Sequence, residues 1–502
     1  MNGVQLLLIA GAGIAVAAIA RRRGLEPGMF IVVLAAAASF IPGMPRLELD
    51  SEVILAIVVP PLLYSATRGT PLSSFGRNLR PIISLGVILV VLTAGALGLV
   101  ATWLLPSIGV AAFVLGAVLA PPDTITTVSH GEEIGLPARA TSVLTGESLV
   151  NDATALTLFT IALAAVDGEH TTVGGGVGEF FRSALLGIGI GALLAVLTLW
   201  VRKRLRNPTL ETALVLLLPF TAFLAAEQVH ASGILAVVIA AFSVSTNLTF
   251  DPRHQYPGAF RTRVQENQVW PVLDFLLETF VFAYIGLQLR FVLEDLASSD
   301  EPGLTGTLIA AGVLLLAAIV IRLVGVYALF GRWMLRARLN ARRLRTDARY
   351  RARMEQRAGR FGGLPVEPPS QGETLLAGWT GMRGILTLAA AAAIPELTSS
   401  GEPFPGRDAI QAIALIVTLG TLLIQGTTIG WLARALRFDV AGERAAREEL
   451  RDRARRLMDG RDFDGQREAV LTGMRERWLT EEVARELIEE IDLRQTASSN
   501  PM

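Results

Sequence analysis

Residues 111–124 read Ala-Ala-Phe-Val-Leu-Gly-Ala-Val-Leu-Ala-Pro-Pro-Asp-Thr, an apolar run broken by two prolines and followed by a carboxylate. The run is apolar enough to enter a lipid bilayer, yet each proline removes a backbone donor and clashes with the preceding helical turn. Broken backbone at membrane depth is tolerated only where protein buries it or where it lines a wet cavity. The stretch therefore predicts an interrupted helix within a multi-span membrane protein.

The composition of the whole chain agrees with this reading. Of 502 residues, 52% are hydrophobic and 18% are charged, against ~25% charged in ordinary soluble domains. A window of ~20 apolar residues finds about thirteen candidate spans. They lie near 3–20, 27–42, 51–66, 81–105, 108–129, 138–166, 180–201, 209–227, 232–247, 268–288, 304–331, 373–395 and 408–432. We therefore expect an all-α polytopic membrane protein with about thirteen transmembrane helices.

Basic residues indicate the orientation of these spans. Arg21, Arg22 and Arg23 follow the first apolar run, whereas in a cleavable signal peptide the positive charges precede it. With alternating spans, about 25 basic residues fall in loops on one side of the membrane and about four on the other. The positive-inside rule places the N-terminus outside and the C-terminus in the cytoplasm, with the chain in the inner (plasma) membrane.

Composition also excludes several classes of function. The 45 basic residues balance 45 acidic residues, so we expect no nucleic-acid partner. The chain has no cysteine and four histidines, which argues against disulfides, zinc–thiolate sites and iron–sulfur clusters. No His-Glu-x-x-His motif is present, and we expect neither an enzyme nor a bound cofactor. Residues 174–178 read as a flexible glycine linker, and residues 332–372 as a soluble loop.

Few charged side chains fall within the apolar spans, where a charge costs ~2.5–3.5 kcal/mol or more. They are Asp123, Glu147, Asp152, Asp274, Glu278, Arg322 and Arg383. Glu147, Ser148, Asn151 and Asp152 share adjacent sectors of one helix face. Such an oxygen cluster suits a hard cation such as Na⁺. A cluster that only joins helices by hydrogen bonds is the alternative, and it needs fewer polar groups than are present.

The remaining buried charges predict supporting contacts. A buried arginine needs a carboxylate, and Glu147 and Glu278 are both candidates to pair with Arg322. Asp274 lies one turn before Glu278 and close enough to the inner surface for its side chain to reach water. Asp123 follows the prolines, where its carboxylate can cap a new helix N-terminus.

A second span is loosened around Arg383 by Gly378, Gly381 and Gly384. The interrupted spans are the fifth and the twelfth, so they have opposite orientation, as in transporters built from inverted repeats. We expect two crossing broken helices within two inverted six-helix repeats, in which the charges of Asp123 and Arg383 compensate the helix-end dipoles. The expected organisation is a transmembrane domain over 1–437, with repeats near 3–166 and 209–432 joined by helix 180–201, and a helical cytoplasmic tail over 438–502.

Several motifs carry a family resemblance. Gly146-Glu147-Ser148-Leu149-Val150-Asn151-Asp152 resembles the ion-binding motif of the sodium/proton exchanger family, the first group of monovalent cation:proton antiporters. Similar stretches lie at 60–64, 277–280, 381–384 and 423–428, and the resemblance extends over residues 1 to about 437, with an arginine-rich composition that looks bacterial. One departure is Pro122, because many relatives have threonine before the aspartate of the break.

The resemblance implies roles for these residues and a homodimer. Asp152 would bind the cation and the proton in competition, with Glu147, Ser148 and Asn151 in or next to the site. Asp123 and Arg383 would be the acidic and basic residues of the crossing unwound helices. Na⁺ would be held by Asp152, Ser148 and Glu147, while K⁺ and Li⁺ remain open as alternative substrates.

The physical account of such a site is independent of the name. A carboxylate that holds either a proton or a cation, and crosses the membrane only when loaded, enforces exchange. One titrating carboxylate implies about one H⁺ per monovalent cation and hence electroneutral exchange, provided that Arg322 keeps Glu147 ionised. A second aspartate at position 151 would make the exchange electrogenic. The alternative is another cation-coupled secondary transporter, or a cation channel, using the same buried acidic cluster.

Overall fold

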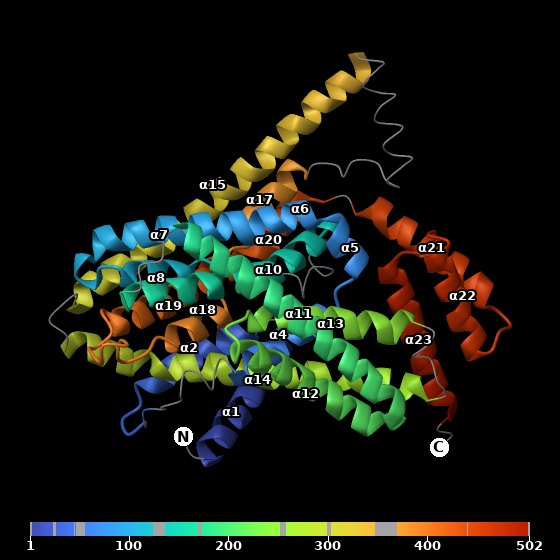
Figure 1. Cartoon of the computed structure of the whole chain (residues 1–502), viewed down its shortest axis with the longest axis horizontal. Coiled ribbons are helices and arrows are strands. Elements are labelled where there is room, and N and C mark those ends of the chain that lie inside the picture. Colours follow the sequence, from blue (N-terminus) through green and yellow to red (C-terminus); the bar gives the residue numbers. More distant parts are fainter. Residues whose placement is uncertain are drawn as a thin grey trace.

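The computed structural model describes residues 3–23, 27–44, 46, 56–123, 136–168, 173–251, 258–298, 303–346, 369–438 and 440–499. Within these ranges every regular element is a helix, and the only extended pairing is an isolated bridge between Leu397 and Pro403 (Figure 1). The expected all-α architecture is confirmed for the described part of the chain.

The helices follow one another from α1 to α23. The first half contains α1 (Gly3–Arg22), α2 (Pro27–Ser39), α4 (Val59–Arg68), α5 (Leu72–Arg77), α6 (Leu79–Ile83), the π-helix η1 (Ser84–Leu89), α7 (Val90–Leu104), the 3-10 turn η2 (Pro106–Ile108), α8 (Ala111–Leu119), α10 (Ala138–Val166), α11 (Val173–Leu205), α12 (Pro208–Glu227) and α13 (Gly233–Phe250). The second half contains α14 (Ala259–Ser298), α15 (Gly303–Thr346), α17 (Gln371–Trp379), α18 (Ile385–Ala392), α19 (Arg407–Thr421), the π-helix η4 (Leu422–Gly426), α20 (Thr427–Leu436), α21 (Ala441–Met458), α22 (Phe463–Arg475) and α23 (Glu481–Ser499).

Eight helical stretches among the described residues are long and apolar enough to cross a membrane. They are Leu79–Leu104, Ala138–Val166, Phe181–Leu205, Pro208–Glu227, Gly233–Phe250, Ala259–Ala297, Gly303–Leu335 and Arg407–Leu436. The count of about thirteen spans stays a prediction. Several of the other expected spans are represented by shorter helices, because a broken span yields half-helices such as α8, α17 and α18.

Both predicted interruptions are present. Helix α8 ends at Leu119, and residues 120–123 are not helical. The continuation of that span after Asp123 falls on 124–135, outside the described residues. The second break is described on both sides, since α17 ends at Trp379 and α18 begins at Ile385.

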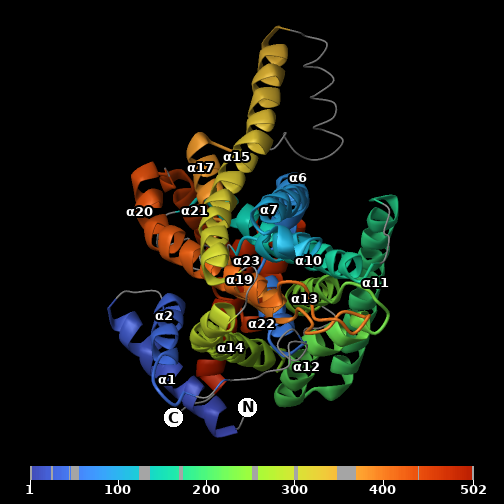
Figure 2. The same cartoon turned by 90° about the vertical axis from the view of Figure 1, so that its left-hand side faces the viewer.

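The expected glycine linker at 174–178 is wrong, and the expected soluble loop at 332–372 is helical over 332–346. Its residues 347–368 lie outside the described part of the chain. Residues 174–178 form the first turns of α11, because glycine lowers helix propensity by ~1 kcal/mol without forbidding a helix. Residues 332–346 continue α15, which projects beyond the other helices (Figure 2). This stretch contains arginine, leucine and alanine, which are strong helix formers, and no glycine or proline after Gly331.

The membrane domain has one large apolar core and two further cores that the next helices form. The larger core joins α1, α2, α4 and α11–α14, which we call the scaffold unit. Two groups of helices form the other cores: α7, α8, α10, α15, α18 and α19 around one, and η1, α10, α15 and α17 around another. Together with α20, which packs on α17, these helices are called the site unit. Leu149 and Ala153 of α10 belong to the scaffold core, so α10 lies where the two units meet.

The tail forms a small bundle of its own. Helices α21, α22 and α23 enclose an apolar core that includes Met458, Val470 and Ile491. Figure 1 shows this bundle (red) at one end of the membrane domain, where α23 packs on α14. The described tail is therefore a docked three-helix unit, as its helical spacing of Arg and Glu predicted in part.

Candidate functional site

The polar residues of α10 lie at the boundary between the scaffold and site units. Glu147 and Asn151 are 0% exposed and Ser148 is 2% exposed, while Asp152 is half-buried. The close approach of α10 to η1 depends on Gly86, since a Cβ there would lie 2.9 Å from Cβ of Val150 and 3.2 Å from the backbone nitrogen of Asn151.

Asn151 connects α10 to the first break. Its Nδ2 donates to the carbonyl oxygen of Pro122 at 2.7 Å, and its Oδ1 is buried without a hydrogen-bond partner among the described atoms. A buried amide oxygen without a donor costs about 1–3 kcal/mol unless a ligand supplies the missing interaction. Amide, hydroxyl and carboxylate oxygens on neighbouring turns form a donor set that fits a hard monovalent cation.

The two breaks are held against each other. The backbone N–H of Asp123 donates to the carbonyl oxygen of Met382 at 2.6 Å. The Asp123 side chain lies against Gly384, because a Cβ built on Gly384 would be 1.8 Å from Oδ2 of Asp123. Gly384 immediately precedes α18, so the carboxylate stands at the positive end of that helix.

Arg383 provides the opposite charge. Its side chain is 1% exposed, and its Nε donates to the carbonyl oxygen of Leu119 at 2.9 Å, at the C-terminal end of α8. Its backbone nitrogen donates to Oγ1 of Thr421 at 3.0 Å. A cation at a helix C-terminus and an anion at a helix N-terminus each oppose the local dipole. This arrangement places a positive and a negative side chain at facing helix ends within the bilayer.

Arg322 pairs with Glu147 rather than with Glu278. Its Nη2 donates to Oε2 of Glu147 at 3.0 Å, and Nη1 contacts Oε1 of the same carboxylate. Nη2 also donates to the carbonyl oxygens of Ala377 at 3.0 Å and Thr380 at 3.2 Å, at the end of α17. The pair is 0% and 3% exposed, so Glu147 is neutralised by a neighbouring helix of the site unit.

The acidic residues of α14 lie in a different environment. Glu278 is half-buried, one turn after Asp274. Asp274 accepts a hydrogen bond from the Ser65 hydroxyl of α4. Both helices belong to the scaffold unit, whereas the Glu147–Arg322 pair joins α10 and α15.

Several polar groups were missed by the sequence reasoning. Arg202 bonds Glu211 at 2.9 Å and Glu266 at 3.0 Å, and all three are buried at one end of the scaffold unit. Arg202 and Glu266 lie just outside the expected spans 180–201 and 268–288, and Glu211 lies at the start of the span 209–227. Gln425 is 1% exposed and neither of its amide atoms has a partner among the described residues. It lies in η4, and such π-helical turns are frequent at functional sites.

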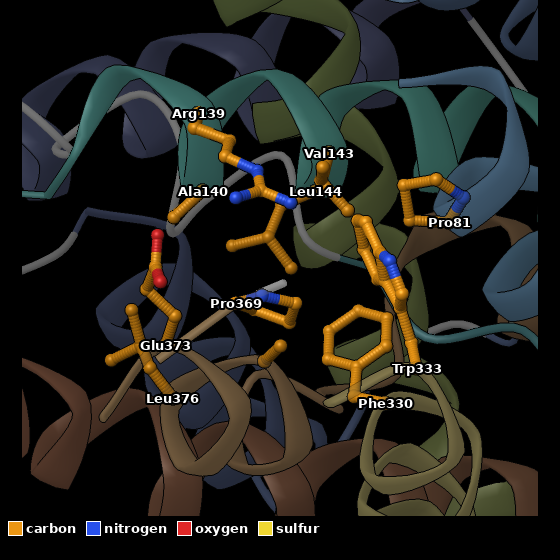
Figure 3. A pocket seen from close by; sticks show the side chains of 11 residues that line it. Pro81, Arg139, Ala140, Val143, Leu144, Phe330, Trp333, Pro369, Glu373 and Leu376 are labelled. Carbon is orange, nitrogen blue, oxygen red and sulfur yellow. The ribbon is translucent and has the colours of Figure 1, made fainter. Parts of the chain in front are cut away.

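A small cleft opens beside the start of α10, between α6, α15 and α17. Figure 3 shows its mostly apolar lining, with Arg139 and Glu373 on one side. The Arg139 guanidinium stands 5.1 Å from the centre of the Trp333 ring. None of the cation-ligand candidates of α10 lines this cleft, so it is separate from the candidate site.

The sequence is similar to known ion exchangers over most of its length. Residues 6–435 match the family model described as sodium/hydrogen exchanger, transmembrane. An uncharacterized Na⁺/H⁺ exchanger of Mycobacterium tuberculosis is 31% identical over 449 residues, covering 87% of this chain and 76% of the relative. The sodium, potassium, lithium and rubidium/H⁺ antiporter of Bacillus subtilis is 28% identical over 397 residues, covering 77% of this chain and 54% of that protein.

A solved structure shows the same fold. The sodium proton antiporter MjNhaP1 of Methanocaldococcus jannaschii at pH 8 superposes with a TM-score of 0.62 at 18% identity. The match covers 86% of this chain and 97% of that chain.

Proposed function

Because the chain belongs to the sodium/hydrogen exchanger family, we propose that it exchanges Na⁺ for H⁺ across the cell membrane at a site centred on Asp152. The observation that carries the assignment is the oxygen cluster of α10 beside the two crossed breaks. Within it, Oδ1 of Asn151 is a buried acceptor whose partner is not a described protein atom. A transported cation would supply that partner.

Competition for Asp152 is the core of the proposed mechanism. Its carboxylate either coordinates Na⁺ or binds a proton, and the two states exclude each other. Asn151 Oδ1 and the Ser148 hydroxyl complete the oxygen set on the same helix face. Glu147 lies beside them as part of this site, and because its carboxylate is paired with Arg322, the proposed cycle assigns it no proton. One proton then exchanges for one monovalent cation, and net charge does not cross the membrane.

Alternating access follows from the position of α10. The helix packs against the cores of both units, so a displacement of the site unit along the scaffold unit would carry Asp152 from one side of the membrane to the other. Asp123 and Arg383 would hold the two breaks together during that movement, because each opposes the dipole of a half-helix in the same unit. Glu278 would support the site from the scaffold side.

The charge pattern and the exposed apolar surface support a membrane orientation and an oligomeric state for the exchanger. The N-terminus lies outside and the tail in the cytoplasm, in the inner membrane. A homodimer would bury the apolar faces of α1 and α11, where Leu7 is 76% exposed and Leu193 is 67% exposed. The exchanger domain would comprise residues 1–437, with inverted repeats on either side of α11.

A proteoliposome assay tests this function. An imposed Na⁺ gradient should drive H⁺ movement, read by an internal pH dye, and Asp152→Asn should abolish it. Exchange that survives in Asp152→Asn would refute the assignment. K⁺, Li⁺ and Rb⁺ tested in parallel would establish the substrate range, for which the name of the Bacillus relative gives the panel. Cation flux without counter-moving H⁺ would instead favour a channel.

A further inference from the structure

Helices α5 and α10 of the membrane domain begin directly after a proline, which supplies no side-chain cap. Pro71 precedes α5 and Pro137 precedes α10, and neither makes a side-chain cap hydrogen bond. A proline side chain has no acceptor, whereas a normal N-cap residue accepts from the first free backbone N–H groups. Both helix starts therefore depend on acceptors from elsewhere.

Carboxylates of the tail supply these acceptors. Oε2 of Glu443, on α21, accepts from the backbone nitrogen of Ala138 at 3.0 Å. Glu481, the first residue of α23, accepts from the backbone nitrogens of Leu72 at 3.1 Å and Ser73 at 2.9 Å. A carboxylate at a helix N-terminus also interacts favourably with the helix dipole. Each contact joins segments more than three hundred positions apart in the sequence.

The far end of the tail is fixed to the scaffold unit. Asp492 of α23 is 2% exposed and accepts from Nε of Arg263 on α14 at 2.6 Å and from Nη2 of Arg467 on α22 at 2.7 Å. Arg485 donates to Oγ of Ser245, on α13, at 3.1 Å. Buried charged hydrogen bonds of this kind are much stronger than surface ion pairs. Helix α23 is thus anchored on α13 and α14.

The N-terminal end of the tail is connected through the chain to the site unit. Helix α21 begins at Ala441, five residues after α20 ends at Leu436, and its Glu443 reaches the start of α10. The tail is therefore continuous with one unit and anchored on the other. Helix α5 lies at the same junction, because it connects α4 of the scaffold unit to α6 and η1.

We infer that Glu443 and Glu481 are positioning residues of the exchanger. From a distant part of the same chain they cap α10 and α5, and they slow the movement between the inward-facing and outward-facing states. The inference rests on the proposed exchange function. Helix α21 shares the apolar core of the tail bundle with the anchored α23. If α10 moves relative to that bundle, the bond between Glu443 and Ala138 breaks, so the cap favours the conformation in which it forms. Loss of an N-cap changes an equilibrium by about fivefold.

Glu443→Ala tests the cap on α10. The side chain is exposed, so its removal leaves the packing of the tail intact, and Glu449→Ala on the exposed face of the same helix is the matched control. The variant should exchange about fivefold faster at saturating Na⁺, with faster amide hydrogen exchange at 138–141. Glu443→Gln keeps an acceptor oxygen and should lie between the variant and the wild type. Wild-type transport or wild-type amide protection in Glu443→Ala would overturn the inference.

A crosslink tests the contact at α5 from the opposite direction. The chain has no cysteine, and the Ser74 hydroxyl contacts the Glu482 carboxylate directly. In Ser74→Cys with Glu482→Cys, a short bifunctional thiol reagent should reduce exchange at least tenfold, while either single variant treated in the same way should keep its rate. Unchanged exchange after complete crosslinking would overturn the inference.

The two proposals fail in different ways. If the wild type moves no H⁺, the exchange function fails, yet amide protection at 138–141 still reports whether Glu443 caps α10. If the wild type exchanges and Asp152→Asn does not, the site is supported, and the rate of Glu443→Ala decides the role of the tail.

Discussion

Gly384→Ala is the most direct test of the geometry of the crossed breaks. A Cβ on residue 384 would lie 1.8 Å from Oδ2, 2.5 Å from Cγ and 2.5 Å from Cβ of Asp123. Carbon atoms in contact are normally ~3.5–4.0 Å apart, so the two segments must separate by about 1 Å. A change of rotamer cannot relieve the clash, because the Cβ of Asp123 is fixed to its backbone.

The backbone resists that separation. The N–H of Asp123 is bonded to the carbonyl of Met382 at 2.6 Å, and moving the segments apart stretches this bond. The expected effect comes from the steric clash and not from a left-handed backbone, since residue 384 has a φ of −123°. Overpacking of this kind costs about 1–3 kcal/mol of stability, and a displacement of ~1 Å at a reacting centre can cost ~10²-fold in rate.

The assay compares Gly384→Ala with Gly95→Ala in proteoliposomes. A Cβ on Gly95, in α7, would meet no atom within 4 Å, so the same chemical change there should leave exchange unaltered and should not lower thermal stability. Gly384→Ala should lose ~10²-fold in Na⁺-driven H⁺ movement while still eluting as a folded protein. Wild-type exchange in Gly384→Ala would refute the described packing of Asp123 on the start of α18.

Three other changes address separate contacts. Arg322→Ala should destabilise the detergent-solubilised protein by ~3–5 kcal/mol in a thermal unfolding assay, because Glu147 stays buried without its partner. Adding Glu147→Ala should recover part of the lost stability. Equal melting temperatures for the single and double variants would contradict the pairing. Asn151→Asp should lose exchange activity progressively as pH rises, because a protonated carboxyl can donate to the Pro122 carbonyl and an ionised one cannot. A pH profile of exchange parallel to that of the wild type would argue against this bond. Asp492→Ala removes the acceptor that Arg263 and Arg467 share, so limited trypsin digestion should release the tail faster than in the wild type, and an unchanged digestion pattern would count against the anchor.

Local patterns predicted much of the architecture. Apolar length predicted the helical membrane domain, and Pro121-Pro122 predicted the end of α8 before Asp123 because proline cannot continue a helix. The i to i+4 spacing placed the polar residues of α10 on adjacent sectors of one face. These inferences depend only on neighbours within a few residues along the chain.

Partners distant in sequence could not be predicted in the same way. Helical spacing indicates which face a residue occupies but not which helix packs there, so Arg322 had two candidate carboxylates and only the fold selects Glu147. The contact between Asp123 and Gly384 depends on the absence of a side chain, which leaves no local signal. The docking of Glu443 and Glu481 depends on a long-range arrangement of a highly charged tail whose spacing predicted only solvated helices.

The hydrogen bond from Asn151 to the Pro122 carbonyl constrains how the sequence of such a protein can evolve. One side chain sets both the number of ionisable groups beside Asp152 and the path of the broken backbone, since its amide nitrogen holds the Pro122 carbonyl. A substitution that altered the charge balance of the cycle would also release the break. A transition from electroneutral to charge-moving exchange would therefore require a compensating change near residue 122, which makes the stoichiometry robust to single mutations.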